Sequence, residues 1–160
     1  MDPDFLAQFL TQAAVFALVC LPIPMVLGML WYGPLFGAPW MRAVCKAADE
    51  LTMGAGLILG TAAAWLLTSF AVAVGVGILI NQPLVANILD FGGVTWPLLI
   101  LVILTTIAYL GLGLNHIIMA KNYQGQPYSL AFIDFGYQYL GILLLAIAQF
   151  FLFRSGWLGG

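Results

Sequence analysis

The chain has 160 residues, of which 64% are hydrophobic and only 6% are charged. A soluble domain carries roughly 25% charged residues, so this chain has too few charges to cover a water-exposed surface. Side chains that face lipid need no charge. The composition therefore excludes an ordinary soluble domain and predicts an integral membrane protein. The few basic residues are scattered, so no nucleic-acid partner is expected.

Four apolar segments follow one another along the chain. Each exceeds the ~20 residues that an α-helix needs to cross a hydrocarbon core, and none alternates with the period of two that is typical of a barrel strand. We expect one domain over residues 1–160, an all-α membrane protein with a bundle of four transmembrane helices. The expected helices cover residues 5–31, 55–80, 96–120 and 129–153.

The first expected helix contains two prolines, Pro22 and Pro24. Both lack the amide hydrogen that would bond to the carbonyl of Leu18 or Cys20, so a kink is expected there. The kink is either a bend for packing or a broken helix whose freed carbonyls face a cavity, as in transporters. The helix begins with the acidic stretch MDPDF and its apolar run is long, so a cleaved signal peptide is not expected.

A dense group of aromatic, glycine and proline residues, LWYGPLFGAPWM, ends the first helix. Glycine and proline interrupt a helix, and tryptophan and tyrosine are enriched at membrane–water interfaces. We therefore expect a short interfacial segment whose rings rest at headgroup depth. The hydroxyl of Tyr32 should find a hydrogen-bond partner near Asn115. The interfacial motif consists of Trp31, Tyr32, Gly33, Pro34 and Trp40.

Small residues recur at every fourth position of the second expected helix. This spacing lets helix backbones approach closely in lipid. The partner is either another helix of the same chain or a second subunit. The small-residue stripe consists of Gly56, Gly60, Ala64 and Thr68.

Basic residues are distributed unevenly between the two sides. Arg42 and Lys46 follow the first helix, Lys121 lies between the third and fourth, and Arg154 stands alone near the C-terminal end. Lysine and arginine favour cytoplasmic connections. Both termini are therefore expected outside the cytoplasm.

A small polar set is expected at one depth in the third and fourth helices. His116 and Asp134 should both lie ~6–8 Å inside the cytoplasmic boundary, given a rise of ~1.5 Å per residue. An ionisable group at this depth is costly unless it is paired or hydrated, so Asp134 is expected to face the interior and bond to the third helix. The set would be an interhelical clamp or a proton-responsive or ligand-binding pocket, unless Asp134 reaches water instead. The candidate polar pocket comprises Asn115, His116, Asp134, Tyr137 and Gln138.

The chemical motifs that mark common enzymes do not occur. The sequence has no phosphate-binding loop, no H-E-x-x-H, no C-x-x-C and no dinucleotide-binding glycine pattern. A single histidine cannot build a multi-histidine metal site in one chain. Cys20 and Cys45 are expected in different environments, so no disulfide is expected between them. The sequence gives no catalytic residue, no metal site and no identified cofactor, and we do not expect an enzyme.

The segment WYGPLFGAPWM resembles the signature of a family of small bacterial integral membrane proteins known only as a domain of unknown function. The resemblance continues at Asn115 and through a later segment, and it departs from the family pattern at Asp134, where an amide is expected. It implies a bacterial inner-membrane location and carries no activity with it. The matching positions of the later segment are Gly125, Pro127, Leu130, Ile133, Gly136 and Tyr137.

Three classes of function stay open. The first is a non-enzymatic membrane module, an accessory or oligomeric subunit that offers a packed helical surface to lipid, to its own copies or to a larger complex. The second is a small-solute or proton-coupled transporter or channel that uses the polar groups near His116 and Asp134. The third is a protein that binds a lipid, quinone or pigment.

Overall fold

The computed structural model describes residues 3–44, 55–81, 95–124 and 127–156. Over these residues the protein is all-helical and contains no strand, which confirms the all-α part of the expected fold class. Lys46 and Cys45 lie outside the described residues. The elements are α1 (Pro3–Cys20), α2 (Pro22–Leu30), the π-helical turn η1 (Trp31–Leu35), α3 (Gly37–Val44), α4 (Ala55–Ile80), α6 (Thr95–Gln124) and α7 (Tyr128–Arg154).

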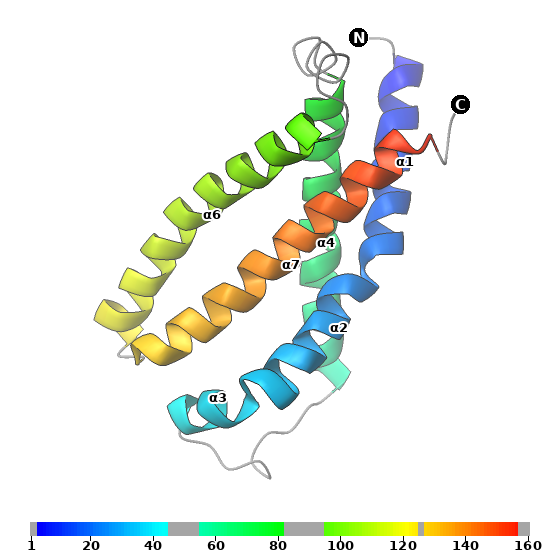
Figure 1. Ribbon diagram of the computed structural model, residues 1–160. Helices are drawn as coiled ribbons and strands as arrows, with labels where there is room; N and C mark the ends of the chain where they lie inside the picture. Colours follow the sequence, from blue (N-terminus) through cyan, green and yellow to red (C-terminus); the bar gives the residue numbers. More distant parts are fainter. Residues whose placement is uncertain (1–2, 45–54, 82–94, 125–126, 157–160) are drawn as a thin grey trace.

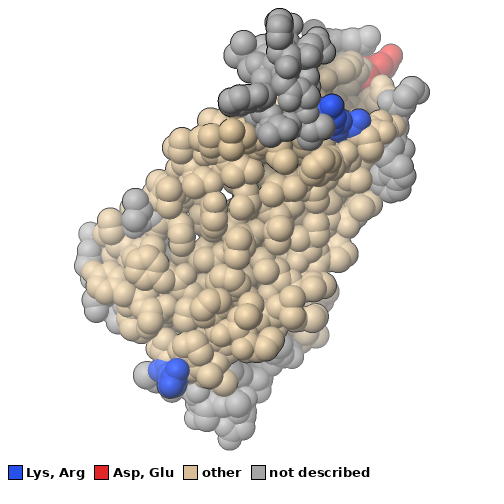
Figure 2. Space-filling view, viewed as in Figure 1, with Lys and Arg blue, Asp and Glu red and all other residues tan. Residues whose placement is uncertain are grey.

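Three segments of the described chain are long and apolar enough to cross a membrane: Asp4–Leu35, Ile58–Ile80 and Tyr128–Arg154. In α6 the apolar part that the structure describes is the shorter stretch Pro97–Gly111. Figure 2 shows that the described surface between the two ends of the molecule carries no charged side chain on the face in view. Three of the four expected spans are therefore present as long apolar helices, and the fourth stays a prediction.

Helix α7 lies at the centre of the arrangement (Figure 1), where it contacts α1, α2, α3, α4 and α6. α1 packs against α4, and α6 runs antiparallel to α7 along much of its length. The start of α1 and the end of α7 lie at one end of the molecule, while α3 lies at the other. The segment α2–η1–α3 therefore passes along the lower half of α7 and is held against it.

The first helix bends at Leu21, between α1 and α2. The amide of Leu21 donates to the carbonyl of Leu18 at 3.3 Å, in a tighter turn than an α-helix makes. In a regular helix that amide would bond to Ala17 instead, so the bend frees the Ala17 carbonyl. The buried hydroxyl of Ser69 on α4 donates to this carbonyl at 3.2 Å. The expected kink is present, and the carbonyls freed at Ala17 and Leu18 accept bonds within the protein.

A buried glutamine on α7 also bonds to Ser69, so that α1, α4 and α7 meet in one polar junction. The Gln149 side chain is fully buried, and its Nε2 donates to the backbone oxygen of Ser69 at 3.0 Å and to its Oγ at 2.9 Å. Its Oε1 has no partner among the described residues. The three helices are thus joined in their apolar interior by hydrogen bonds that converge on Ser69.

The two polar side chains of this junction should respond differently to removal. Ser69→Ala leaves the Ala17 carbonyl without its donor, so we expect a loss of about 1 kcal/mol in the free energy of unfolding. Gln149→Leu also removes the unsatisfied Oε1, and Ser69 keeps its bond to Ala17, so we expect a change near zero. Unfolding of the purified protein in mixed micelles by increasing sodium dodecyl sulfate measures both. A larger loss for Gln149→Leu than for Ser69→Ala would contradict this assignment.

Candidate functional site

The aromatic turn interrupts the first helix where the sequence predicted a break. Gly33 has non-helical backbone angles (φ −96°, ψ −107°), and the amide of Phe36 donates to the carbonyl of Trp31 at 2.8 Å in a wider, π-type turn. At Gly37 a Cβ atom would lie 2.6 Å from the carbonyl oxygen of Tyr32. Such a contact is too short for any side chain, so glycine at this position lets the chain fold back into α3.

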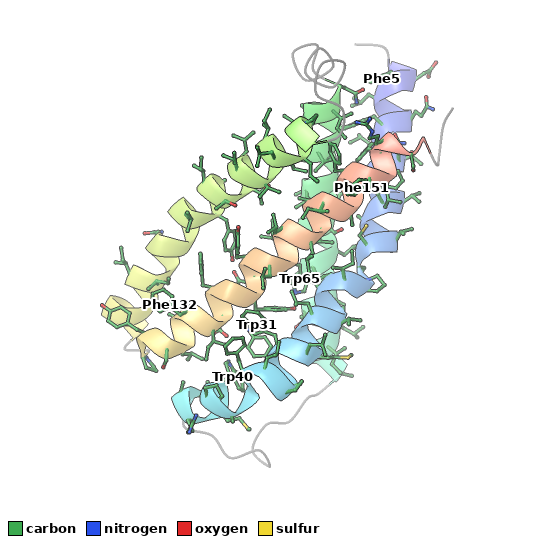
Figure 3. All side chains as sticks on the ribbon, viewed as in Figure 1. Phe5, Trp31, Trp40, Trp65, Phe132 and Phe151 are labelled. Carbon is green, nitrogen blue, oxygen red and sulfur yellow. The ribbon has the colours of Figure 1, made fainter. Side chains whose placement is uncertain are left out.

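The aromatic rings of this turn bind to α7. The Nε1 of Trp31 donates to the carbonyl of Ile133 at 3.0 Å. The hydroxyl of Tyr32 and the Nε1 of Trp40 both donate to Oδ1 of Asp134, at 2.9 Å and 3.2 Å. We predicted a partner for Tyr32 near Asn115, but its acceptor is Asp134 on α7. The headgroup depth of these rings stays a prediction. Their polar atoms turn inward to acceptors on α7, and Figure 3 shows Trp31 and Trp40 between α7 and the α2–α3 segment.

Asp134 is half-buried, and it is the acceptor that joins η1 and α3 to α7. We predicted bonds from Asp134 to the third expected helix, but its described partners are Tyr32 and Trp40. Asn115 is exposed on α6, and the His116 side chain lies outside the described residues. A bond from Asp134 to His116 therefore stays a prediction. The partners that the structure shows were not foreseen, because the prediction compared depth only on helices adjacent in sequence, whereas the bend in the first helix brings its end under α7 (Figure 1).

Tyr137 connects α7 to the bend of the first helix. Its buried hydroxyl donates to the carbonyl of Pro24 at 3.0 Å. Its ring packs edge-on against Tyr32 and Trp65, with centroids 5.1 and 5.4 Å apart. Tyr137 therefore belongs to the joint between α2, α4 and α7, and its polar atom is directed away from α6.

Two glycines of α7 allow the aromatic rings to approach the helix backbone. A Cβ atom at Gly136 would lie 2.9 Å from Cζ2 of Trp31, and one at Gly141 would lie 2.5 Å from Cη2 of Trp65. Ordinary van der Waals contacts are longer than either distance. The turn and α4 thus pack onto α7 at positions where α7 has no side chain.

Gln138 faces α6, unlike Asp134 and Tyr137. Its Oε1 accepts a hydrogen bond from the hydroxyl of Tyr109 at 2.8 Å. One turn away, the hydroxyls of Thr106 and Tyr139 lie 2.8 Å apart. Sequence reasoning missed Tyr109, Thr106 and Tyr139. Counting ten residues back from the end of α6 at Gln124 and ten forward from the start of α7 at Tyr128 places residue 114 opposite 138, so the connection alone would not have identified Tyr109.

The small-residue stripe of α4 faces outward. Gly56, Gly60 and Ala64 are exposed, and a Cβ atom at either glycine would have no neighbour within 4 Å. The hydroxyl of Thr68 donates to the carbonyl of Ala64 within the same helix. Packing inside the described chain therefore does not use the stripe.

The three candidate pocket residues of α7 bond to three different elements. Asp134 binds the aromatic turn, Tyr137 binds the bend in the first helix, and Gln138 binds α6. The described residues contain no group of three or more histidine, cysteine, aspartate or glutamate side chains that could hold a metal ion. In chemical terms, the arrangement is a set of hydrogen-bonded clamps that fixes α7 to its neighbours.

Comparison with known proteins gives one family and no individual relative. A family model described as "Protein of unknown function (DUF1761)" matches residues 13–149. No curated protein and no solved structure matches the chain. The matched range includes the aromatic turn and the clamp residues of α7. The resemblance to a family of unknown function is thus confirmed.

Proposed function

Since the chain belongs to the DUF1761 family, for which no function is given, we propose from its own geometry that it is a non-enzymatic membrane module. The protein offers a rigid helical surface, through which it assembles in the bilayer with further copies of the chain or with other subunits. It acts as an accessory or oligomeric component and carries out no chemical step.

The proposal rests on the hydrogen bonds that the polar side chains of the interior make. The side chains of Asp134, Tyr137 and Gln149 each bond to a different neighbour of α7: the aromatic turn, the backbone of α2, and Ser69 of α4. Interhelical hydrogen bonds of this kind stabilise helix packing in lipid. A catalytic or transport site would need some of these groups to converge on a substrate, and here they are engaged in joining helices.

The arrangement in the membrane follows from length and charge. We propose that α6, which has 30 residues, is the fourth span and that the protein is a multi-pass protein of the bacterial inner membrane. Arg42 is exposed on α3, at the end of the molecule opposite both termini. Under the positive-inside rule this end is cytoplasmic and both termini lie outside.

The exposed small-residue stripe of α4 supports assembly through this helix. Exposed glycines at four-residue spacing allow two helices to approach closely, and packing of this kind drives association in lipid. Gly56 and Gly60 have open space above them in the single chain. We propose that a helix of another subunit occupies it.

Native mass spectrometry of the gently solubilised protein tests this assembly. The wild type is expected as a complex heavier than one 17.2 kDa chain. Gly60→Ile should release the single chain, because a branched side chain keeps the helices apart. Gly111→Ile is the matched control, since Gly111 is also exposed with no neighbour within 4 Å but lies on α6. A wild type of single-chain mass, or equal effects of the two variants, would refute assembly through α4.

A further inference from the structure

Two glutamines of α1 have no hydrogen-bond partner among the described residues. Gln8 is exposed and Gln12 is half-buried. Thr11, which lies between them, donates its hydroxyl hydrogen to the carbonyl of Ala7 at 2.8 Å, but neither glutamine bonds back to its helix in this way. A glutamine side chain offers two donor hydrogens and one acceptor oxygen. In the single chain these groups face the surroundings of α1.

The depth of Gln12 makes its unpaired amide costly in a bilayer. The ring of Phe9 packs against Gly77 of α4, where an added Cβ would lie 2.5 Å from its Cε2. Gly77 lies three residues from the end of the span Ile58–Ile80. Gln12 lies three residues deeper than Phe9, so it is ~9 Å inside that end. At this depth an amide that faces acyl chains lacks the hydrogen bonds that it would make in water.

Both glutamines belong to one outward face of α1, which we call the α1 seam. Its five side chains follow one another at alternating spacings of three and four residues, the spacing that keeps side chains against a parallel partner helix. Apart from the glutamines they are apolar, and none is charged. The α1 seam consists of Phe5, Gln8, Gln12, Val15 and Val19, all exposed or half-buried. The face of α1 that is buried within the chain consists of other residues, Ala13, Phe16, Ala17 and Cys20.

The α1 seam is complementary to itself. Copies of one chain insert into a bilayer with the same orientation, so two copies that meet symmetrically are related by a two-fold axis along the membrane normal. Their α1 helices then run in parallel, and each residue of the seam lies opposite the same residue of the other copy. An amide both donates and accepts, so the Gln12 side chains of two copies can bond to each other. An acyl chain offers them neither a donor nor an acceptor.

We propose that the α1 seam is a contact between two copies of this chain, held in the bilayer by hydrogen bonds between their Gln12 side chains. The contact goes beyond the proposed assembly through α4 and does not depend on it, because it uses another helix and no residue of the small-residue stripe. In a detergent micelle water competes for the amides. The contact is therefore expected in the bilayer and not in the solubilised complex.

Disulfide crosslinking of introduced cysteines, in the membranes of cells that express the full chain, tests the contact. Cys20 is buried, and Cys45→Ser removes the other native thiol. Leu18 and Val19 are exposed to similar degrees, 58% and 46%, but they point ~100° apart around α1. Val19→Cys should form a covalent dimer on oxidation, whereas Leu18→Cys is the matched control and should not. Equal crosslinking at the two positions, or a Val19→Cys product with a foreign chain only, would overturn the proposal.

Gln12→Leu then separates the amide pair from packing alone. Leucine is apolar and suits an outward position in lipid, and it removes the donors and the acceptor. The apparent dissociation constant of the dimer should therefore rise about tenfold, the ratio that corresponds to one interhelical hydrogen bond at the strong end of those measured in model peptides. The crosslinked fraction of Val19→Cys, in liposomes of decreasing protein-to-lipid ratio, measures this constant.

Three further variants, each combined with Val19→Cys, complete the test. Gln12→Asn keeps an amide and should retain most of the crosslinking. Gln138→Leu makes the same change at an exposed position of α7 and should leave the crosslinking unchanged. Gly60→Ile should keep the crosslink, so a failure of the assembly through α4 is distinguished from a failure of the α1 contact. Unchanged crosslinking in Gln12→Leu, or an equal loss in Gln138→Leu, would overturn the proposal.

Discussion

Replacing Asp134 by leucine is expected to lower the free energy of unfolding by about 1–3 kcal/mol, because it leaves two donors without their acceptor. The hydroxyl of Tyr32 and Nε1 of Trp40 both lose Oδ1. Tyr32 and Trp40 are only half-buried, so water and lipid headgroups can bond to some of the freed donors. The expected loss of stability is therefore smaller than the full cost of two unpaired donors. The end of the first helix should then separate from α7.

Asp134→Asn is the matched variant, and it should keep most of the stability. Both donors reach the same oxygen of Asp134, and an asparagine side chain retains one oxygen that can accept both bonds. The charge of the carboxylate is therefore not needed for the clamp. An amide at this position agrees with the pattern that the family resemblance implies.

Unfolding in mixed micelles measures the stability of the wild type and of the two Asp134 variants. Proteolytic cleavage within residues 37–44 reports the release of α3 from α7. The expected order of stability is wild type, then Asp134→Asn close to it, then Asp134→Leu well below. Equal losses in both variants would show that the negative charge itself is required. No loss in either would show that the aromatic turn is held by its packing alone.

The sequence predicts where the aromatic turn interrupts the first helix, but it does not predict which residues the turn contacts. Glycine and proline chemistry is local, so the break at Gly33 could be placed from the sequence. The acceptor of Tyr32 is 102 residues away, and no local pattern identifies it. Tryptophan and tyrosine also have two common environments in membrane proteins, the interface and the helix–helix contact. Choosing between them requires the path of the bent first helix.

The polar residues of α7 illustrate the same limit. The sequence singled out Asp134, Tyr137 and Gln138 because polar groups in an apolar run need partners, and each of them has one. The sequence did not show which neighbouring helix each side chain faces. Residues one position apart point ~100° apart around a helix, so neighbours in sequence can face different helices. Gln149 was missed although it is the polar member of the run LLLAIAQFFLF. A count of polar residues in each apolar run would have identified it together with Ser69.

The packing of α4 on α7 is expected to tolerate little added volume. In Gly141→Ala the added Cβ would lie 2.5 Å from Cη2 of Trp65. Trp65 has only 7% of its surface exposed and belongs to the cluster of Cys20, Tyr137 and Leu145, so its ring has little room to retreat. Overpacking of this kind costs about 1–3 kcal/mol of unfolding free energy. The same loss should extend to the Tyr137 joint, since Trp65 packs edge-on against that ring.

Gly75→Ala on α4 is the control for this prediction. Gly75 is exposed and has no atom within 4 Å of an added Cβ. The substitution there should raise stability by up to about 1 kcal/mol, because alanine favours a helix more than glycine does. Unfolding in mixed micelles compares the two alanine variants directly, and it separates crowding at Gly141 from the helix propensity that both changes share. If Gly141→Ala is as stable as Gly75→Ala, then the Trp65 ring moves freely, and α4 is not held to α7 by this contact.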